Sequence, residues 1–190
     1  MQNYFKFVFL GKFAICLQFV FSCDKILLIN KQEVKMKEVN IVLYSPEIPQ
    51  NTGNISRTCA VTGAKLHIIK PIGFEISDRT LKRAGLDYWD KLDVTYYENY
   101  EDFFRQNGSE PIFFFSAHGK KSYAEIEYPN GVFLVFGRES VGLPKELIEE
   151  NIDRCVRIPM RKTLRCLNLS NSVAIAVYEA LRQGGFEGLE

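Results

Sequence analysis

The polar residues best suited to chemistry lie in three loops, each of which follows an apolar segment. In the first loop, residues 46–57, Asn51 and Arg57 flank Gly53 close to the predicted start of a helix. Backbone N–H groups at a helix start attract anions, and a guanidinium binds phosphate through two parallel hydrogen bonds. Gly53 permits an unusual backbone angle in such a loop. The spacing indicates either a phosphate-binding loop or a helix-capping loop with a solvated arginine.

The second loop, FGRESVGLP at residues 136–144, places Glu139 between Gly137 and Gly142. A glycine directly after a buried strand lets the backbone approach a ligand closely, and a second glycine supports a tight turn. The alternative is an ordinary strand-to-helix turn with an exposed acid.

The third loop holds a polar run at residues 165–171, directly before an amphipathic segment. There the apolar residues recur with the spacing of a helix packed on a core, at Val173, Ala176, Val177, Ala180 and Leu181. Ser170 is the predicted N-cap of this helix, and Gly184–Gly185 is its predicted stop.

The elements that must position these loops alternate along the chain from residue 36 onward. We predict strands at 39–44, 65–69, 92–96, 112–116, 132–136 and 155–158, and helices at 55–62, 78–84, 100–106, 145–151 and after 170. This order predicts an α/β fold with a mostly parallel sheet and helices on both faces. Ligands bind such sheets at the carboxyl ends of the strands, where the three loops begin.

The composition excludes several classes of protein. A formal net charge of +1 over 190 residues does not fit a uniformly basic nucleic-acid binder, so any RNA site must be a local patch. Five cysteines without CxxC spacing and only two histidines predict no metal site, and they suit a reducing cytoplasm. The chain has no Walker A motif and no GxGxxG opening a βαβ unit.

Three further features have simple alternatives. His67 is predicted to be a strand residue rather than a base, and His118 a loop residue near a ligand pocket rather than a catalyst. Residues 82–89 mix basic and aromatic side chains, which suits either phosphate and base contacts or a surface helix.

The first 35 residues differ from the rest, with six of the fifteen phenylalanines between residues 4 and 21. This segment is a signal peptide, a membrane anchor, or an artefact of start-site choice with Met36 as the true start. The missing cleavage site and the interrupting Lys12 favour the artefact. We therefore expect residues 1–35 to be an extension and residues 36–190 to form a single domain.

At these motifs the chain resembles the SPOUT superfamily of RNA methyltransferases, in particular the TrmH-like 2′-O-methyltransferases and, within them, the small TrmL-type tRNA wobble-nucleotide enzymes. The resemblance covers Met36 to about Phe186 and rests on PEIPQNTGNISRTCAVTGAKLHII, LKRAGLDYW, FGRESVGLP, and IPM followed by LNLSNSVAIAVYEALRQ. It implies an α/β sheet with a C-terminal deep trefoil knot, S-adenosylmethionine as methyl donor and no metal. It also implies a cytoplasmic homodimer with tRNA as its partner and no stable membrane partner.

The resemblance also implies roles for individual residues. Those expected to line the cofactor pocket are Phe115, Gly137, Ile158 and Cys166, although the family usually has serine at the last position. Those expected around the reaction centre are Asn51, Arg57, Glu139 and Asn168. Arg57, with a neighbouring RNA phosphate, would orient the ribose hydroxyl and accept or relay its proton. Asn51 would place the ribose, while Glu139 and Asn168 would hold the loops and Arg57.

The implied reaction is methyl transfer to the ribose 2′-hydroxyl of the wobble nucleotide, a cytidine or modified uridine at position 34, with leucine tRNAs as expected substrates. One alternative is the same fold acting on another tRNA ribose or on rRNA. Another is a non-catalytic relic that binds RNA or the cofactor. The four retained polar residues argue against the relic, and Cys166 is the one feature in its favour.

Overall fold

The computed structural model describes residues 37–74, 92–161 and 166–190. Predictions about the extension at 1–35, the helix at 78–84 and the basic–aromatic segment at 82–89 lie outside these residues. Residues 37–190 form one compact unit. Within the described ranges, no helix combines the length and the hydropathy that crossing a membrane requires.

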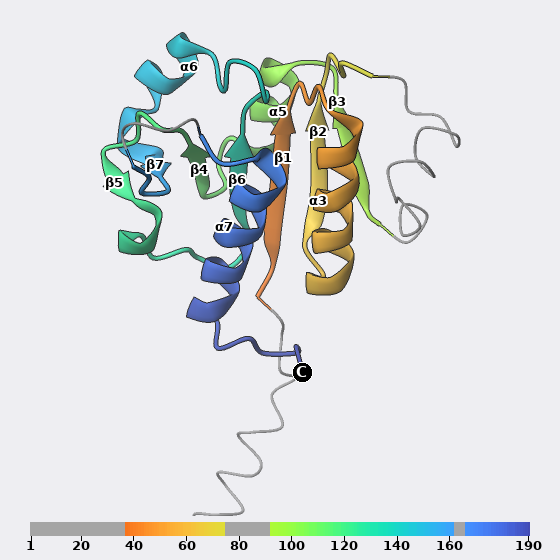
Figure 1. Cartoon of the computed structure of the whole chain (residues 1–190), viewed down its shortest axis with the longest axis vertical. Coiled ribbons are helices and arrows are strands. Elements are labelled where there is room, and N and C mark those ends of the chain that lie inside the picture. Colours follow the sequence, from red (N-terminus) through yellow and green to blue (C-terminus); the bar gives the residue numbers. More distant parts are fainter. Residues whose placement is uncertain (1–36, 75–91, 162–165) are drawn as a thin grey trace, which may run out of the picture. The chain divides into compact units, whose positions relative to one another are not determined.

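The described residues form a seven-stranded sheet in which every neighbouring pair is parallel. The predicted sheet is thus confirmed and is more uniform than expected. The strand order is β3-β2-β1-β6-β4-β7-β5 (Figure 1). The strands are β1 (Val39–Tyr44), β2 (Lys65–Ile69), β3 (Val94–Tyr97), β4 (Ile112–Phe115), β5 (Lys121–Ser122), β6 (Val132–Phe136) and β7 (Cys155–Arg157).

Helices cover both faces of the sheet, as predicted. Helices α3 (Pro49–Thr62) and α7 (Leu169–Gln183) lie side by side on one face, and α5 (Tyr100–Asn107) and α6 (Lys145–Glu150) pack on the other. Two short 3-10 helices, η2 (Tyr123–Glu125) and η3 (Ile152–Arg154), complete the described elements.

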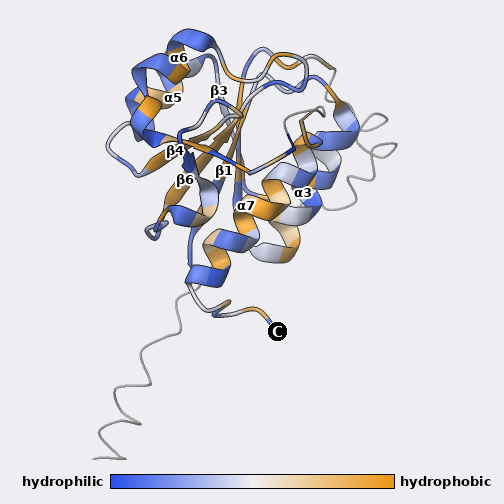
Figure 2. Cartoon of the chain, turned by 60° about the vertical axis from the view of Figure 1, so that its left-hand side comes forward, coloured by the Kyte–Doolittle hydropathy of each residue, from blue (hydrophilic) through white to orange (hydrophobic). Residues whose placement is uncertain are grey.

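The central strand β1 shows how the two cores form. Ile41 and Leu43 point into the α3/α7 core and Val42 into the α5/α6 core, and all three are fully buried. Alternation follows from the two-residue period of a strand, and each such burial contributes about 1.5–3 kcal/mol. Figure 2 shows hydrophobic residues along the strands, and both hydrophobic and hydrophilic residues on α3 and α7.

Helix α7 has the predicted buried stripe but a different cap. All five predicted core positions are buried, from Val173 to Leu181. The cap is Asn168 rather than Ser170, because the Asn168 Oδ1 accepts hydrogen bonds from the Ser170 backbone N at 2.9 Å and from the Ser170 Oγ at 2.6 Å. The helix ends at Gly184, as predicted, and Gly185 follows with φ 70°.

Helix α3 begins six residues earlier than the predicted helix at 55–62. Pro49 occupies its first turn, where the fixed φ of proline suits a helix and the missing N–H costs nothing. Asn51 and Gly53 are therefore buried helical residues, and the expectation of an unusual backbone angle at Gly53 is wrong. This early start turns the Asn51 side chain inward.

Candidate active site

Three of the predicted cofactor residues lie at the carboxyl ends of three adjacent strands, β6, β4 and β7. Phe115 ends β4 and pairs with Phe136 on one side and with Val156 on the other. Gly137 follows Phe136 directly, and Ile158 lies two residues beyond Val156. Because the strands are parallel, these residues share one edge of the sheet (Figure 1). The rings of Phe115 and Phe136 stack there, with centroids 4.6 Å apart.

The loop after β6 is folded back tightly on itself. Arg138 and Gly142 exchange two backbone hydrogen bonds, of 3.2 and 2.9 Å, and Gly142 has φ 74°. A Cβ on Gly137 would lie 2.2 Å from the Gly142 carbonyl carbon and from the Leu143 nitrogen. The loop can therefore close only with glycine at position 137.

Glu139 connects this loop to the start of α3. Its carboxylate accepts hydrogen bonds from the backbone N of Glu47 at 2.9 Å and from the backbone N of Ile48 at 3.2 Å. It also accepts one from the Asn51 Nδ2 at 3.0 Å. One carboxylate thus satisfies two backbone donors near a helix start and fixes the orientation of a buried side-chain amide.

Asn51 in turn connects to the segment before α7. Its Oδ1 accepts a hydrogen bond of 2.9 Å from the Asn168 Nδ2. The Asn168 Oδ1 is already occupied by Ser170, so both amides have defined orientations. The structure therefore joins Glu139, Asn51 and Asn168, three of the four predicted catalytic residues, in one chain of hydrogen bonds.

Arg57 lies on a different side of α3. Asn51 is only 4% exposed, whereas Arg57, six residues later, is exposed. Six residues correspond to about 240° of rotation around a helix, which accounts for the difference. Val61, one turn beyond Arg57, shares this exposed side and is 59% exposed.

Cys166 is exposed and lies two residues before Asn168. It differs in this from Cys59 and Cys155, which are buried, and burial raises the pKa of the Cys59 thiol to about 12. The loop directly before Cys166, residues 162–165, lies outside the described residues.

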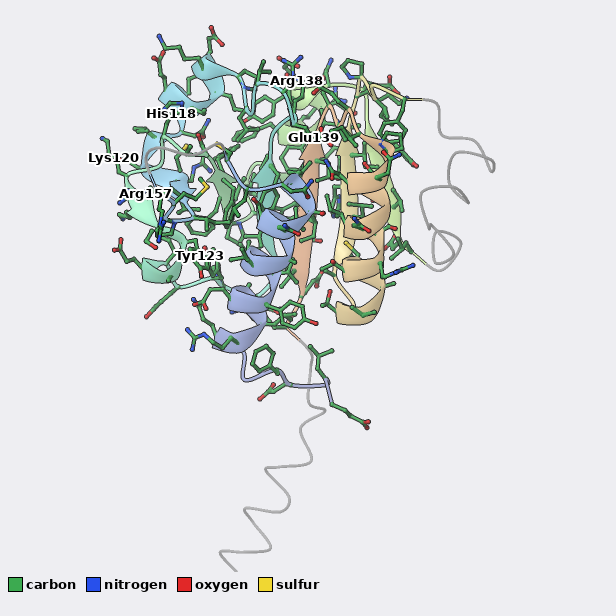
Figure 3. The ribbon with its side chains drawn as sticks, in the orientation of Figure 1. His118, Lys120, Tyr123, Arg138, Glu139 and Arg157 are labelled. Carbon is green, nitrogen blue, oxygen red and sulfur yellow. The ribbon has the colours of Figure 1, made fainter. Side chains whose placement is uncertain are left out.

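Sequence reasoning missed three polar contributors. Glu47 receives hydrogen bonds from the Ser140 backbone N at 3.1 Å and the Ser140 Oγ at 2.9 Å. The Arg138 guanidinium lies 5.9 Å from the centroid of the Tyr44 ring, and its buried Nε has no hydrogen-bond partner among the described residues. Figure 3 shows Arg138 and Glu139 near the end of β1. The sequence could have pointed to these residues only through their positions within the two motifs, because the Glu47–Ser140 and Arg138–Tyr44 contacts each join segments that are far apart in the chain.

Both histidines lie in the elements predicted for them, a strand for His67 and a loop for His118. His67 lies in β2, where its ring nitrogens contact the Tyr97 hydroxyl at 3.0 Å and the Asn40 Oδ1 at 3.2 Å, and burial lowers its pKa to about 4. His118 is an exposed loop residue beyond β4, on the side of the sheet that carries β5 and β7 (Figure 3).

A cavity of about 590 Å³ lined by Tyr100, Phe104 and Arg154 belongs to the α5/α6 face and not to the three loops of the candidate site.

Known proteins share this arrangement over most of the chain. A relative from Geobacillus stearothermophilus, provisionally named a tRNA (cytidine(34)-2′-O)-methyltransferase, is 51% identical over 154 residues, which are 80% of this chain and 98% of that protein. A second relative is a solved structure from work on the 2-OH methylation of C/U34 on tRNA. It is 43% identical, with a TM-score of 0.71, and the match covers 78% of this chain and 97% of that one.

An rRNA methyltransferase from Sinorhizobium meliloti, solved with bound AdoMet, is 28% identical with a TM-score of 0.69, over 79% of this chain and 58% of that one. The model of the SpoU rRNA methylase family matches residues 38–178. That match spans β1 through most of α7 and includes all the loops described above. The chain therefore belongs to the SpoU rRNA methylase family.

Proposed function

We propose that this protein transfers a methyl group from S-adenosylmethionine to the ribose 2′-hydroxyl of the wobble nucleotide of tRNA, with leucine tRNAs as substrates. The main support is the chain of hydrogen bonds through Glu139, Asn51 and Asn168, which lies beside the strand ends of β6, β4 and β7. Two similar proteins, each matched over at least 97% of its length, are described by the same reaction and position.

The strand ends fit an adenosine-based cofactor. Phe115 and Ile158 offer apolar surface, and the tight loop after Gly137 brings backbone groups close to the same edge. A nucleoside is held well by apolar packing combined with a few backbone hydrogen bonds. Cys166 would contribute through its backbone. When bound, S-adenosylmethionine supplies a methyl group on a positively charged sulfur, which leaves as a neutral thioether.

The polar residues would act by positioning. Methyl transfer is an in-line displacement, so holding the hydroxyl oxygen in line is a large part of catalysis. Asn51, held from both sides by Glu139 and Asn168, would place the ribose. Arg57, with a neighbouring RNA phosphate, would orient the 2′-hydroxyl and accept or relay its proton. Arg138 presents a second guanidinium at the end of β1 that suits a phosphate contact.

We also propose that two copies of the chain form a homodimer through the outer sides of α3 and α7. Val61 on α3 is 59% exposed and Tyr178 on α7 is 48% exposed, on neighbouring helices of one face. Arg57 lies one turn from Val61 on the same exposed side. A dimer built on this surface would bring Arg57 of one copy toward the Glu139–Asn51–Asn168 set of the other.

Mixed dimers test this arrangement. Co-expression of an Arg57→Ala chain with an Asn168→Ala chain should restore about a quarter of wild-type turnover, because half of the dimers are mixed and each has one complete site. Each variant alone should be inactive while still binding S-adenosylmethionine. A mixture as inactive as its components would place Arg57 and Asn168 in the same copy, and normal turnover by Arg57→Ala would remove it from catalysis.

The function itself is tested with a synthetic tRNA that carries a single 2′-deoxynucleotide at position 34. Transfer of a radiolabelled methyl group to the all-ribose tRNA, and its loss on the deoxy version, is the expected result. Equal transfer to both would show that the target is another tRNA position. Transfer to rRNA but not to tRNA would favour the alternative that the Sinorhizobium meliloti relative represents.

Three further proposals, two on structure and one on location, accompany the function. The segment after β7 passes through a loop to form a deep trefoil knot, which a crystal structure tracing residues 158–169 would test. The methyltransferase domain begins at Met36, so a chain starting there should keep full activity. The protein works in the cytoplasm, where its tRNA substrate is available, and cell fractionation checks this location.

A further inference from the structure

We propose that Glu47 is a positioning residue for methyl transfer, acting through Ser140 to hold the loop that carries Glu139. This inference rests on the proposed function, because it assigns a role within the same site. It starts from two carboxylates that connect the same two loops in opposite directions.

The contacts are reciprocal. Glu139 in the loop after β6 accepts hydrogen bonds from the Glu47 and Ile48 backbone and from Asn51. In return, the Glu47 carboxylate accepts hydrogen bonds from the Ser140 backbone N at 3.1 Å and the Ser140 Oγ at 2.9 Å. Two successive residues of one loop are thus clamped by residues about 90 positions away in sequence.

The clamp controls a loop that has few other ways to move. Residues 138 and 142 are joined by backbone hydrogen bonds, and Gly137 allows no larger residue. The loop therefore shifts as a unit, and the Glu47–Ser140 contacts fix its position relative to α3. Gly73 adds a second anchor for the Glu47 side, since its backbone N donates to the Pro46 carbonyl at 2.8 Å.

The consequence reaches the reaction centre through Asn51. Without the Glu47 carboxylate, Ser140 loses both acceptors, and the loop is held against α3 only by the hydrogen bonds of Glu139, whose backbone donors at Glu47 and Ile48 remain. The loop then moves more, and with it the Glu139 contact that orients the Asn51 amide, so the ribose is held less accurately. Because a displacement of about 1 Å can cost roughly 100-fold in rate, we expect turnover to fall while cofactor binding persists.

The test compares Glu47→Ala, Glu47→Gln and Ser140→Ala, with Glu149→Ala as a matched control. Glu149 is an exposed residue on α6 that forms a surface ion pair of 3.4 Å with Lys145. Glutamine can still accept from the Ser140 N and donate to its Oγ. We therefore expect kcat to fall about 10- to 100-fold in Glu47→Ala, to recover to within about threefold of wild type in Glu47→Gln, and to be unchanged in the control.

Two readouts separate positioning from general destabilisation. The affinity for S-adenosylmethionine, measured by titration calorimetry, should change less than about threefold in Glu47→Ala, because a residue that only positions the reacting groups affects turnover and not cofactor binding. Hydrogen exchange of the peptide covering 138–142 should accelerate, whether or not the variant is active. The double variant Glu47→Ala/Ser140→Ala should be no slower than Glu47→Ala alone, because the two residues act as one unit.

The proposal is overturned if Glu47→Ala turns over normally, if exchange at 138–142 is unchanged, or if the two substitutions are additive. Equal losses of kcat and cofactor affinity would show a folding defect and would also overturn it. A wild-type protein that methylates no RNA would instead refute the proposed function, and with it this role for Glu47.

Discussion

Replacing Asn51 with aspartate changes one atom at the centre of the hydrogen-bonded set. The Asn51 Nδ2 donates to a Glu139 oxygen 3.0 Å away, while the Oδ1 accepts from Asn168. Asn51→Asp keeps the shape and the contact to Asn168 but replaces the donor with a second negative oxygen. Two carboxylates this close repel by about 5 kcal/mol at an effective dielectric constant of 20.

A proton can relieve this repulsion. Protonating an ordinary carboxyl costs about 6 kcal/mol at pH 8 but only about 3 kcal/mol at pH 6. Once protonated, the new carboxyl donates a hydrogen bond to Glu139 as the amide did. The Asn51→Asp variant should therefore lose about 5 kcal/mol of unfolding free energy at pH 8 and about 3 kcal/mol at pH 6, relative to wild type at the same pH.

Activity should follow the same direction. We expect methyl transfer by Asn51→Asp to be at least about 100-fold below wild type at pH 8, and the ratio to recover about 30-fold at pH 6, as a difference of about 2 kcal/mol implies. Asn130→Asp is the matched control, because the Asn130 Oδ1 only accepts a hydrogen bond, from the Glu38 backbone N at 2.7 Å. A ratio of variant to wild type that stays constant or falls between pH 8 and pH 6 would show that no repulsion between the new carboxylate and Glu139 controls activity.

Three other perturbations test the cofactor loop, the buried histidine and the proposed RNA surface. Gly137→Ala should weaken S-adenosylmethionine binding more than about 10-fold in calorimetry, because its Cβ would lie 2.2 Å from the backbone of residues 142 and 143; unchanged affinity would exclude the tight loop from the pocket. Burial lowers the pKa of His67 to about 4. The stability that depends on a neutral His67 is complete above pH 6.5 and is lost as the pH falls toward 4, by up to about 3 kcal/mol of unfolding free energy. Urea unfolding of His67→Gln should show a smaller loss of unfolding free energy over this pH range, and a loss equal to that of wild type would assign the pH dependence to other groups. Arg138→Gln should raise the Kd for tRNA about 3- to 10-fold and reduce its salt dependence without affecting cofactor affinity; tRNA binding equal to wild type would remove Arg138 from the RNA surface.

The placement of the residues proposed to line the cofactor pocket could be predicted because it depends on local rules. Phe115, Gly137 and Ile158 each end or follow a short apolar run, and in a parallel sheet all such ends share one edge. The strand order β6-β4-β7 that makes them neighbours could not be derived in this way. The pattern of apolar residues identifies which segments are strands but does not specify which strands pair.

The start of α3 and the cap of α7 show a second limit. Both helices begin with residues that belong to the proposed site: Asn51 lies in the first turn of α3, and Asn168 caps α7. Apolar periodicity is weak in these first turns because tertiary polar contacts replace burial of hydrophobic side chains. The hydrogen bonds of Glu47 and Glu139 span about 90 residues and are visible only once the fold brings the loops together.

Methylation of the wobble ribose by this protein is tested most directly by mapping the methylation of total tRNA from cells with and without its gene, using nuclease digestion and mass spectrometry. The wobble nucleotide of leucine tRNAs should carry a 2′-O-methyl group that disappears when the gene is deleted and returns with the wild-type gene but not with Arg57→Ala. An unchanged wobble ribose in the deletion strain would contradict this function.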